Sequence, residues 1–365
     1  MWIGMGQAEA KTTNLPDTYP SLGQGIRPLG MGNAFLTMPG SDENALFYNP
    51  AALQDFEKSW RYSFMSPGAS FNRKLITMLK DVINLSKDIT NATTTSGKVD
   101  KFDTFVDSHS GEFHSVNLRL PLFSMLRKGW GIGLLVDSRT AFSLRGGQAN
   151  RTFELRTRND GAYVLGKSIG LMGDSLSVGV LVKAIYRVML DRVVISSDII
   201  GTTLTNLIGY KQWGKGFGVG ADVGARYRLP IPVVNPVVAV TYQDIGNTRF
   251  RKAAIDNTPQ TLNAGIGIHP KIGDFGLSVE GTLTQLNQRR DLITRLHAGA
   301  ELRFPWMGPM RLSLRGGTNQ GYAAGGFSLD FKRFRLDGAV YGEELGEFSR
   351  RGKNYRYAAE LAFNF

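Results

Sequence analysis

The stretch from Tyr355 to Phe365 reads YRYAAELAFNF and alternates between two kinds of side chain. Successive side chains on a β-strand point to opposite faces, so this strand would have one apolar, largely aromatic face and one polar or small face. The pattern is typical of a transmembrane β-barrel strand, with lipid on one side and an aqueous interior on the other. It also fits an antiparallel strand of a soluble sheet, so the decision depends on whether the pattern recurs.

The same period of two recurs from Trp130 to the end of the chain. Several of these stretches are long enough to cross a bilayer at a tilt, which takes about 9–11 residues. We therefore predict an all-β fold, a 14-stranded antiparallel transmembrane β-barrel. The strands are expected at 57–66, 112–123, 129–145, 151–170, 174–190, 215–229, 233–245, 259–270, 272–287, 291–304, 309–318, 321–331, 333–343 and 354–365.

The lengths of the connections between these strands support a membrane barrel over a soluble sandwich. Barrels of the outer-membrane type alternate short turns at one end with longer loops at the other. Short links are expected near Leu126, at 171–173, 230–232, 271, 305–308 and 332, and long ones at 67–111, 191–214, 246–258 and 344–353. This sorting of the lengths favours the barrel.

The composition fits such a barrel and argues against several other classes. The 365 residues are 42% hydrophobic and contain no cysteine, which excludes a disulfide framework and thiolate chemistry. No stretch approaches the roughly 18 uncharged apolar residues of a spanning helix. The net charge of +12 would suit the phosphates of outer-membrane lipids and lipopolysaccharide. We expect no nucleic-acid partner, since no basic run is interleaved with aromatic residues.

Residues 1–56 do not have the pattern of strands. Residues 1–10 lack a basic region, yet Gly6-Gln7-Ala8 resembles a cleavage site. They are either the remnant of a signal peptide or an ordinary amino-terminal extension. Residues 11–56 are expected to form a plug and residues 57–365 the barrel. A small helical hairpin on a soluble fold is the alternative for this segment.

A motif in the plug segment supports this division. The segment runs RPLGMGNAF from Arg27, then DENA from Asp42, then YNPAAL from Tyr48. In this pattern the chain resembles the amino-terminal plug of FadL-type outer-membrane transporters, a motif shared with the related PorV- and PorQ-type barrels of a secretion system. The plug residues on which the resemblance rests are Arg27, Gly30, Met31, Gly32, Asn44, Asn49, Pro50 and Ala51.

The resemblance implies a function. FadL-type proteins are outer-membrane barrels that take up hydrophobic small molecules such as long-chain fatty acids by passive diffusion, and they need no cofactor. The implied location is the bacterial outer membrane. The closing aromatic residues Phe363 and Phe365 would then be the signal read by the barrel-assembly machinery. We expect the ligand to enter an apolar pocket above the plug.

The PorV-type branch implies a different role on the same fold, in which the barrel binds secreted or surface proteins as part of a secretion system. A third alternative is an outer-membrane enzyme that modifies lipids. Its residues are not evident, because none of the four histidines has a metal-ligand spacing and His114-Ser115 would face opposite sides of a strand. We therefore expect no catalytic residues and no metal site.

Charged residues on the predicted strands are expected to face the lumen. An arginine facing lipid near the bilayer midplane costs about 2–4 kcal/mol, whereas charges of both signs can pair inside the barrel. The lumen residues are expected to be Arg295, His297, Glu301, Arg303, Arg335, Asp337, Arg356 and Glu360.

Two of the long loops are expected to be apolar. Helical spacing within 73–87 and the aliphatic content of 191–214 suggest a groove that captures a hydrophobic ligand, because exposed aliphatic side chains are unfavourable in water. The capture residues would be Leu75, Leu79, Val82, Ile199, Ile200, Leu204, Leu207 and Ile208. Packing of the two loops against each other is the alternative.

Overall fold

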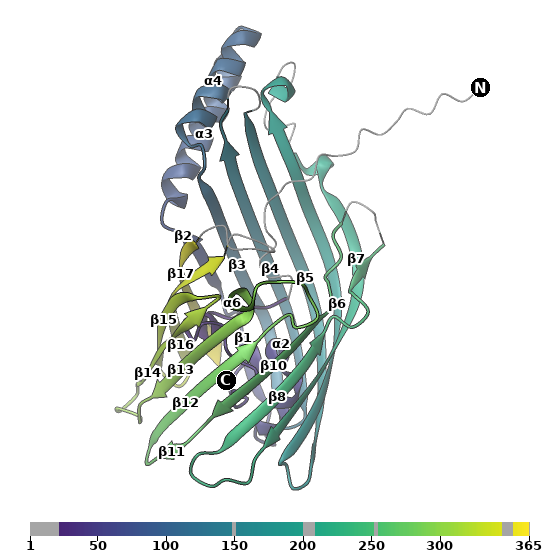
Figure 1. Ribbon diagram of the computed structural model, residues 1–365, viewed down its shortest axis with the longest axis vertical. Coiled ribbons are helices and arrows are strands. Elements are labelled where there is room, and N and C mark those ends of the chain that lie inside the picture. The colour runs from purple at the N-terminus through teal and green to yellow at the C-terminus, as the bar shows by residue number, and fades with distance from the viewer. Residues whose placement is uncertain (1–21, 148–150, 200–208, 252–254, 345–352, 365) are drawn as a thin grey trace, which may run out of the picture.

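The computed structural model describes residues 22–147, 151–199, 209–251, 255–344 and 353–364. These residues form one closed antiparallel barrel, with short helices inside it and a helical hairpin beside its upper end (Figure 1). The barrel closes where β17 (Lys353–Asn364) pairs with β1 (Arg61–Phe64) and β2 (Gly68–Asn72). Within the described residues no helix is long and apolar enough to cross a membrane.

The barrel has 14 strands, as the sequence predicts. The first strand is interrupted at 65–67, so that β1 and β2 together occupy one position in the wall. The two-residue strands β9 (Arg249–Phe250) and β11 (Lys271–Ile272) are local additions. The other strands are β3 (Phe113–Arg127), β4 (Trp130–Arg145), β5 (Thr152–Leu171), β6 (Leu176–Ile195), β7 (Gly214–Arg228), β8 (Pro236–Gln243), β10 (Thr261–Ile268), β12 (Phe275–Leu283), β13 (Leu296–Arg303), β14 (Arg311–Asn319), β15 (Tyr322–Asp330) and β16 (Phe334–Glu344).

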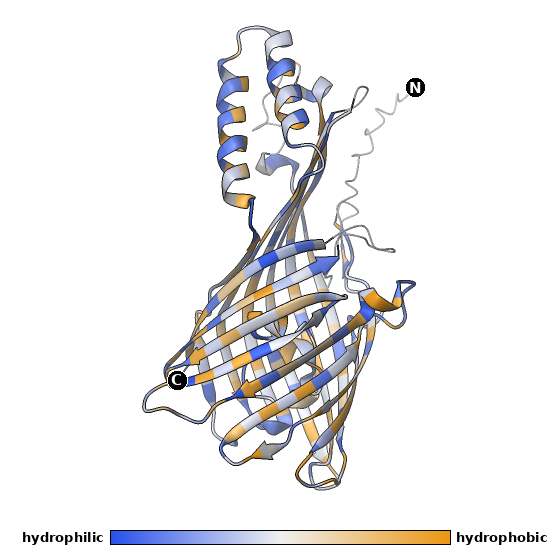
Figure 2. Ribbon diagram, turned by 60° about the vertical axis from the view of Figure 1, so that its left-hand side comes forward, coloured by the Kyte–Doolittle hydropathy of each residue, from blue (hydrophilic) through white to orange (hydrophobic). Residues whose placement is uncertain are grey.

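The polarity of the barrel is inverted relative to a soluble protein. Large apolar side chains such as Val219 and Ile266 are 59% and 60% exposed, whereas Lys183 and Glu280 are 3% and 2% exposed. Figure 2 shows apolar and polar residues alternating along the strands of the lower barrel. Lysine and glutamate are almost never buried unless they are paired, and a wide exposed apolar surface marks a contact with another apolar phase. The outer surface is therefore that of a lipid-embedded barrel.

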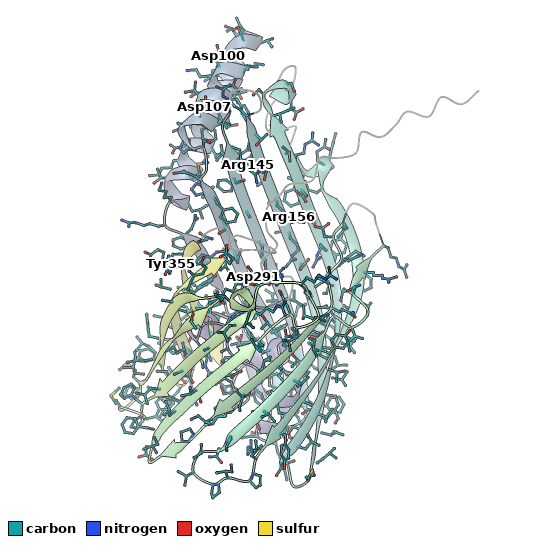
Figure 3. The ribbon with its side chains drawn as sticks, in the orientation of Figure 1. Asp100, Asp107, Arg145, Arg156, Asp291 and Tyr355 are labelled. Atoms are coloured by element: carbon teal, nitrogen blue, oxygen red, sulfur yellow. The ribbon has the colours of Figure 1, made fainter. Side chains whose placement is uncertain are left out.

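The wall is much taller on one side than on the other. Strands β5 and β6 each have 20 residues, whereas β8, β10 and β13 each have 8. At about 3.3 Å per residue the tall strands span roughly 66 Å and the short ones roughly 26 Å. The upper part of β3–β6 therefore projects beyond the short wall. Arg145 and Arg156 lie on this projecting part, above the level of Tyr355 in β17 (Figure 3).

The connections alternate in length as expected, with two exceptions. Turns of a few residues join β3 to β4 and β5 to β6 at one end, which we call the turn end. The long connections leave from the opposite, loop end, and the longest contains α3 (Leu75–Asn91) and α4 (Thr95–Ser108). The exceptions both lie at the loop end. The connection between β4 and β5 has only six residues, 146–151. The connection between β14 and β15 is formed by Gln320 and Gly321, which both have positive φ angles.

The α3–α4 hairpin packs on the outside of the projecting wall and does not lie over the barrel mouth. Its buried residues Met78 and Phe102 join one apolar cluster with Phe142, Phe153 and Val194 of β4, β5 and β6. These strand residues have the same parity as the lipid-facing Leu134, Tyr163 and Val182, so they belong to the outer face. The hairpin therefore covers the apolar outer face where it rises above the short wall (Figure 1).

Candidate functional site

The site is the barrel lumen and the segment inside it, residues 22–56, which we call the inner segment. Its elements are α1 (Ile26–Gly30), α2 (Asn44–Tyr48) and the 3-10 helix η1 (Pro50–Asp55). The last residue of α2 is Tyr48, and Asn49 caps the helix before Pro50, as expected because a residue that precedes proline avoids the helical region. Asn49 is extended, and its side chain accepts a hydrogen bond from Ala51 N in the first turn of η1.

The inner segment contacts strands around much of the barrel. Helix α1 packs against β14, β15, β16 and β17, and η1 packs against β3 to β7. Between these two contacts, the carboxylate of Glu280 on β12 accepts hydrogen bonds from the backbone N–H groups of Leu36 and Thr37. The segment is thus fixed at three places around the barrel circumference.

Glycines allow the backbone of the inner segment to approach the wall closely. A Cβ added at Gly299 of β13 would lie within 3.0 Å of Met31 backbone atoms, and one at Gly179 of β6 within 3.0 Å of Pro50. Gly32 has φ of +65°, which only glycine adopts readily, and its Cα lies against Thr318 and Ala298. Gly30 faces Gly326 of β15. Glycines on both sides, in the inner segment and in the wall, therefore allow the close contact.

A connected set of buried ion pairs joins the inner segment to the wall. Arg27 Nη2 lies 2.7 Å from Glu301 Oε1, and Arg27 Nη1 lies 2.7 Å from Asp42 Oδ2. Glu301 also binds Arg315 at 2.7 Å. The set extends through Asp337 and Arg335 to Glu360, which binds Arg119 at 2.7 Å. Charges of opposite sign alternate along the set, which offsets the cost of burying them.

The charge on Asp42 follows from these neighbours. Burial alone would raise the pKa of the Asp42 carboxyl group, but Arg27 and Arg335 hold that pKa well below its ordinary value. The inner segment therefore contributes a fixed negative charge beside its own Arg27. We infer that the ion pairs hold this part of the segment in register with β13 to β16.

Two further clusters of buried charges lie on the tall side of the lumen. Lys183 Nζ lies 2.7 Å from both Asp222 and Asp244. Arg187 makes paired hydrogen bonds of 2.7 and 2.8 Å to Asp160. These residues, like Arg119 and Arg315, are not among the lumen residues predicted from the sequence. For most of them, the alternation of side chains within the strand could have predicted the inward position. Arg119 is an exception, because it lies before a bulge between Pro121 and Phe123 that shifts the register of β3.

The residues expected in the lumen are placed as follows. Glu301, Arg335, Asp337 and Glu360 belong to the connected set, and Arg303 lies 3.0 Å from Glu301. Arg356 is buried and lies 2.8 Å from Glu343. His297 shares hydrogen bonds with Gly32 O and Thr284 Oγ1, each at 3.0 Å.

Arg295 does not have the predicted strand position. The strand expected over 291–304 begins only at Leu296, because Leu292–Arg295 form the helical turn α6. The Arg295 guanidinium donates to the carbonyl oxygen of Arg290, within the same loop, and is only partly buried. It takes no part in the connected ion pairs described above.

The proposed capture residues are not brought into one described groove. Leu75 and Val82 contact the apolar cluster on the outer wall, while Leu79 is 46% exposed. Ile200, Leu204, Leu207 and Ile208 lie outside the described residues, as does the side chain of Ile199. The expected loop 191–214 is also shorter, because β6 continues to Ile195.

The carboxy-terminal strand has the two faces expected from its sequence. Tyr357 and Phe363 are 43% and 36% exposed on the outside, whereas Glu360 is 1% exposed on the inside. Phe363 pairs with Phe64 of β1 and Phe334 of β16, so it lies at the seam where the barrel closes. Phe365 lies outside the described residues, and the assembly role of both residues stays a prediction.

Comparisons with solved structures agree with this architecture. The structure entitled "TodX monoaromatic hydrocarbon channel deltaS2 mutant" matches with a TM-score of 0.52 and 12% identity, over 93% of this chain and 98% of that one. The COG4313 outer membrane channel from Pseudomonas putida F1 matches over 85% of this chain and 98% of that one, with a TM-score of 0.31 and 10% identity. BamA from Haemophilus ducreyi matches over 83% of this chain and 70% of that one, with a TM-score of 0.30 and 8% identity.

At 12% identity the TodX match supports the fold alone, a closed 14-stranded antiparallel barrel. No protein-family model matches the chain, and no curated protein sequence matches it. Among the described residues there is no group of three or more histidine, aspartate or glutamate side chains that could hold a metal ion.

Proposed function

We propose that the protein is a passive channel of the bacterial outer membrane for small hydrophobic molecules, closed at rest by the inner segment. The observation that carries the proposal is the close contact between this segment and the barrel wall. Its backbone lies against wall glycines on two sides of the barrel, and Arg27 links it to Glu301. A closed barrel with a separately held segment across its lumen is suited to gated diffusion, and the described residues offer no evident catalytic constellation.

An apolar strip on the inner wall supports a hydrophobic permeant. Inward-facing Leu135, Val164, Leu181 and Ile185 of β4 to β6 form one cluster with Leu46 and Leu53 of the inner segment. A permeant that displaced the segment would meet this strip. The hydrocarbon named for TodX is consistent with such a route, although the likeness concerns the fold only.

Uptake by cells tests the proposal. A Gram-negative host would be compared with and without the protein, using labelled single-ring aromatic compounds with and without a polar substituent. Their concentration would be low enough that entry through the outer membrane limits uptake. We expect faster uptake with the protein and no dependence on an energy source. Equal uptake in the two strains, combined with retention of a secreted or surface protein in a pull-down, would instead support the protein-binding role of PorV-type barrels.

A further inference from the structure

A small cavity lies above the inner segment, at the loop end of the short wall. Its volume is about 50 Å³, room for roughly three to five water molecules. It is formed where the last residues of β8 and β12 and the first of β10 and β13 meet the inner segment. The residues that line it are Leu22, Gln24, Asn33, Leu36, Phe47, Tyr48, Gln243, Thr261, Asn263, Thr282, Thr284, Gln285, His297 and Gln320.

Most of the residues in the lining are polar, but none is aspartate, glutamate, lysine or arginine. This differs from the apolar pocket expected from the family resemblance, and from the ion-paired lumen around it. Amide and hydroxyl groups provide both hydrogen-bond donors and acceptors. The lining has two titratable side chains. The Tyr48 hydroxyl donates to Asn33 Oδ1, and His297 has both ring nitrogens engaged, with Gly32 O and Thr284 Oγ1. The cavity therefore offers no counter-charge to an ionic ligand.

One side of the cavity is apolar. Leu22 and Phe47 line it and also belong to the apolar cluster that contains Leu181 and Ile185 of the tall wall. A molecule held here would have hydrogen-bonding groups on one side and an aromatic and aliphatic surface on the other. The cavity volume matches the polar end of such a molecule, while its apolar part would lie along Phe47.

We propose that this cavity is a selectivity site for small uncharged molecules that combine an apolar ring with an amide or hydroxyl group. The proposal rests on the channel function and names its substrate class. Most lining polar groups bond to one another, but the side-chain amides of Gln24 and Gln285 have no hydrogen-bond partner among the described residues, so a pure hydrocarbon would leave these two unpaired. A site built to hydrogen-bond a polar group discriminates strongly against an analogue that lacks it. An anion would lose its hydration without gaining a cationic partner.

Binding of benzamide, benzoate and toluene to the full chain in lipid nanodiscs tests this proposal. The three probes share one ring and differ in the substituent, and ligand-observed NMR would give their affinities. We expect benzamide to bind most tightly. The variant with Gln24→Leu and Thr261→Val keeps the side-chain volumes but removes hydrogen-bonding groups from the cavity. It should bind benzamide roughly tenfold more weakly, with toluene binding unchanged.

A matched control places equivalent changes outside the cavity, with Thr77→Val in α3 and Gln212→Leu near β7, where both residues are exposed. It should bind benzamide like the original protein. Equal affinity of the cavity variant and the original protein for benzamide would overturn the proposal, as would benzoate or toluene binding as tightly as benzamide. Selective benzamide binding in nanodiscs, combined with no faster uptake of benzamide by cells that carry the protein, would leave the site in place and reject the channel function.

Discussion

Arg27 of the inner segment and Glu301 of β13 form a bidentate ion pair, with Nε–Oε2 and Nη2–Oε1 distances of 2.8 and 2.7 Å. The two residues are 274 positions apart in the chain. Both are buried, and Arg27 also binds Asp42 while Glu301 also binds Arg315. Parallel hydrogen bonds of this kind fix orientation as well as distance. The pair therefore links the inner segment to the wall around it.

Replacing Arg27 with methionine should release this part of the inner segment. The substitution keeps a long side chain but leaves Asp42 and Glu301 with fewer cationic partners, and breaking a buried pair typically costs about 3–5 kcal/mol. Because the strand pairings do not involve Arg27, the barrel should still assemble. We expect increased conductance in planar bilayers together with the heat-modifiable gel migration of a folded barrel.

The control for this variant is Lys128→Met. Lys128 pairs with Asp174 at 2.5 Å, but both side chains are substantially exposed at the turn end. Exposed pairs contribute only about 0–1 kcal/mol, so conductance should not change. If Arg27→Met conducts no more than Lys128→Met, the ion pairs do not hold the segment closed.

Gly299→Ala should displace the inner segment by steric pressure. The added Cβ would meet the backbone of Met31 within 3.0 Å, and overpacking of this kind costs about 1–3 kcal/mol. Gly316→Ala on the neighbouring strand β14 is the matched control, because a Cβ there would have nothing within 4 Å. Limited proteolysis from the turn end should cleave the inner segment faster in Gly299→Ala only. Equal cleavage rates in the two variants would contradict the close contact between Met31 and Gly299.

Phe102→Ala should detach the α3–α4 hairpin and leave the barrel intact. Phe102 is fully buried between the hairpin and the outer wall, and a buried phenylalanine replaced by alanine costs about 3–5 kcal/mol. Leu79→Ala, at an exposed position on α3, serves as the control. Hydrogen exchange should rise in residues 75–108 only in the first variant. Loss of the whole barrel would show that the hairpin is required for assembly.

The capture role of loop residues stays a prediction from sequence. Replacing Ile199, Ile200, Leu204 and Leu207 together by serine should slow the uptake of a hydrophobic ligand while the barrel still assembles. Normal uptake with loss of a protein partner would favour the PorV-type role. Failure to assemble would show that this loop is structural.

Much of the barrel is predictable from the sequence because its signal is local. Alternation in β17 fixes which of Tyr357 and Glu360 faces outward, and it does so without any knowledge of the neighbouring strands. Short turns with residues such as Pro305 and Lys332 then set the order of the strands. The motif around Asn49 likewise indicates where α2 ends, since proline at the next position restricts the backbone locally.

The features that sequence did not reveal depend on contacts between distant parts of the chain. Nothing near Lys183 indicates that Asp222 and Asp244 converge on it, because they come from other strands. The helical turn that contains Arg295 interrupts a period of two that looks continuous. The outward packing of Phe102 requires the excess height of β4 to β6, which appears only when strand lengths are compared around the barrel.

The most direct test of the closed-channel account is a reversible cross-link between the inner segment and the wall. The chain has no cysteine, so Gly30→Cys combined with Ala339→Cys introduces a single pair. A Cβ at Gly30 would lie 3.6 Å from Ala339 Cβ, within the range of about 3.5–4.5 Å for disulfides. Uptake of labelled benzamide would be measured in the same cells before and after reduction, with each single-cysteine variant as a control. The account predicts that uptake stops when the cross-link forms and returns when it is reduced. Undiminished uptake through the fully cross-linked barrel would contradict it.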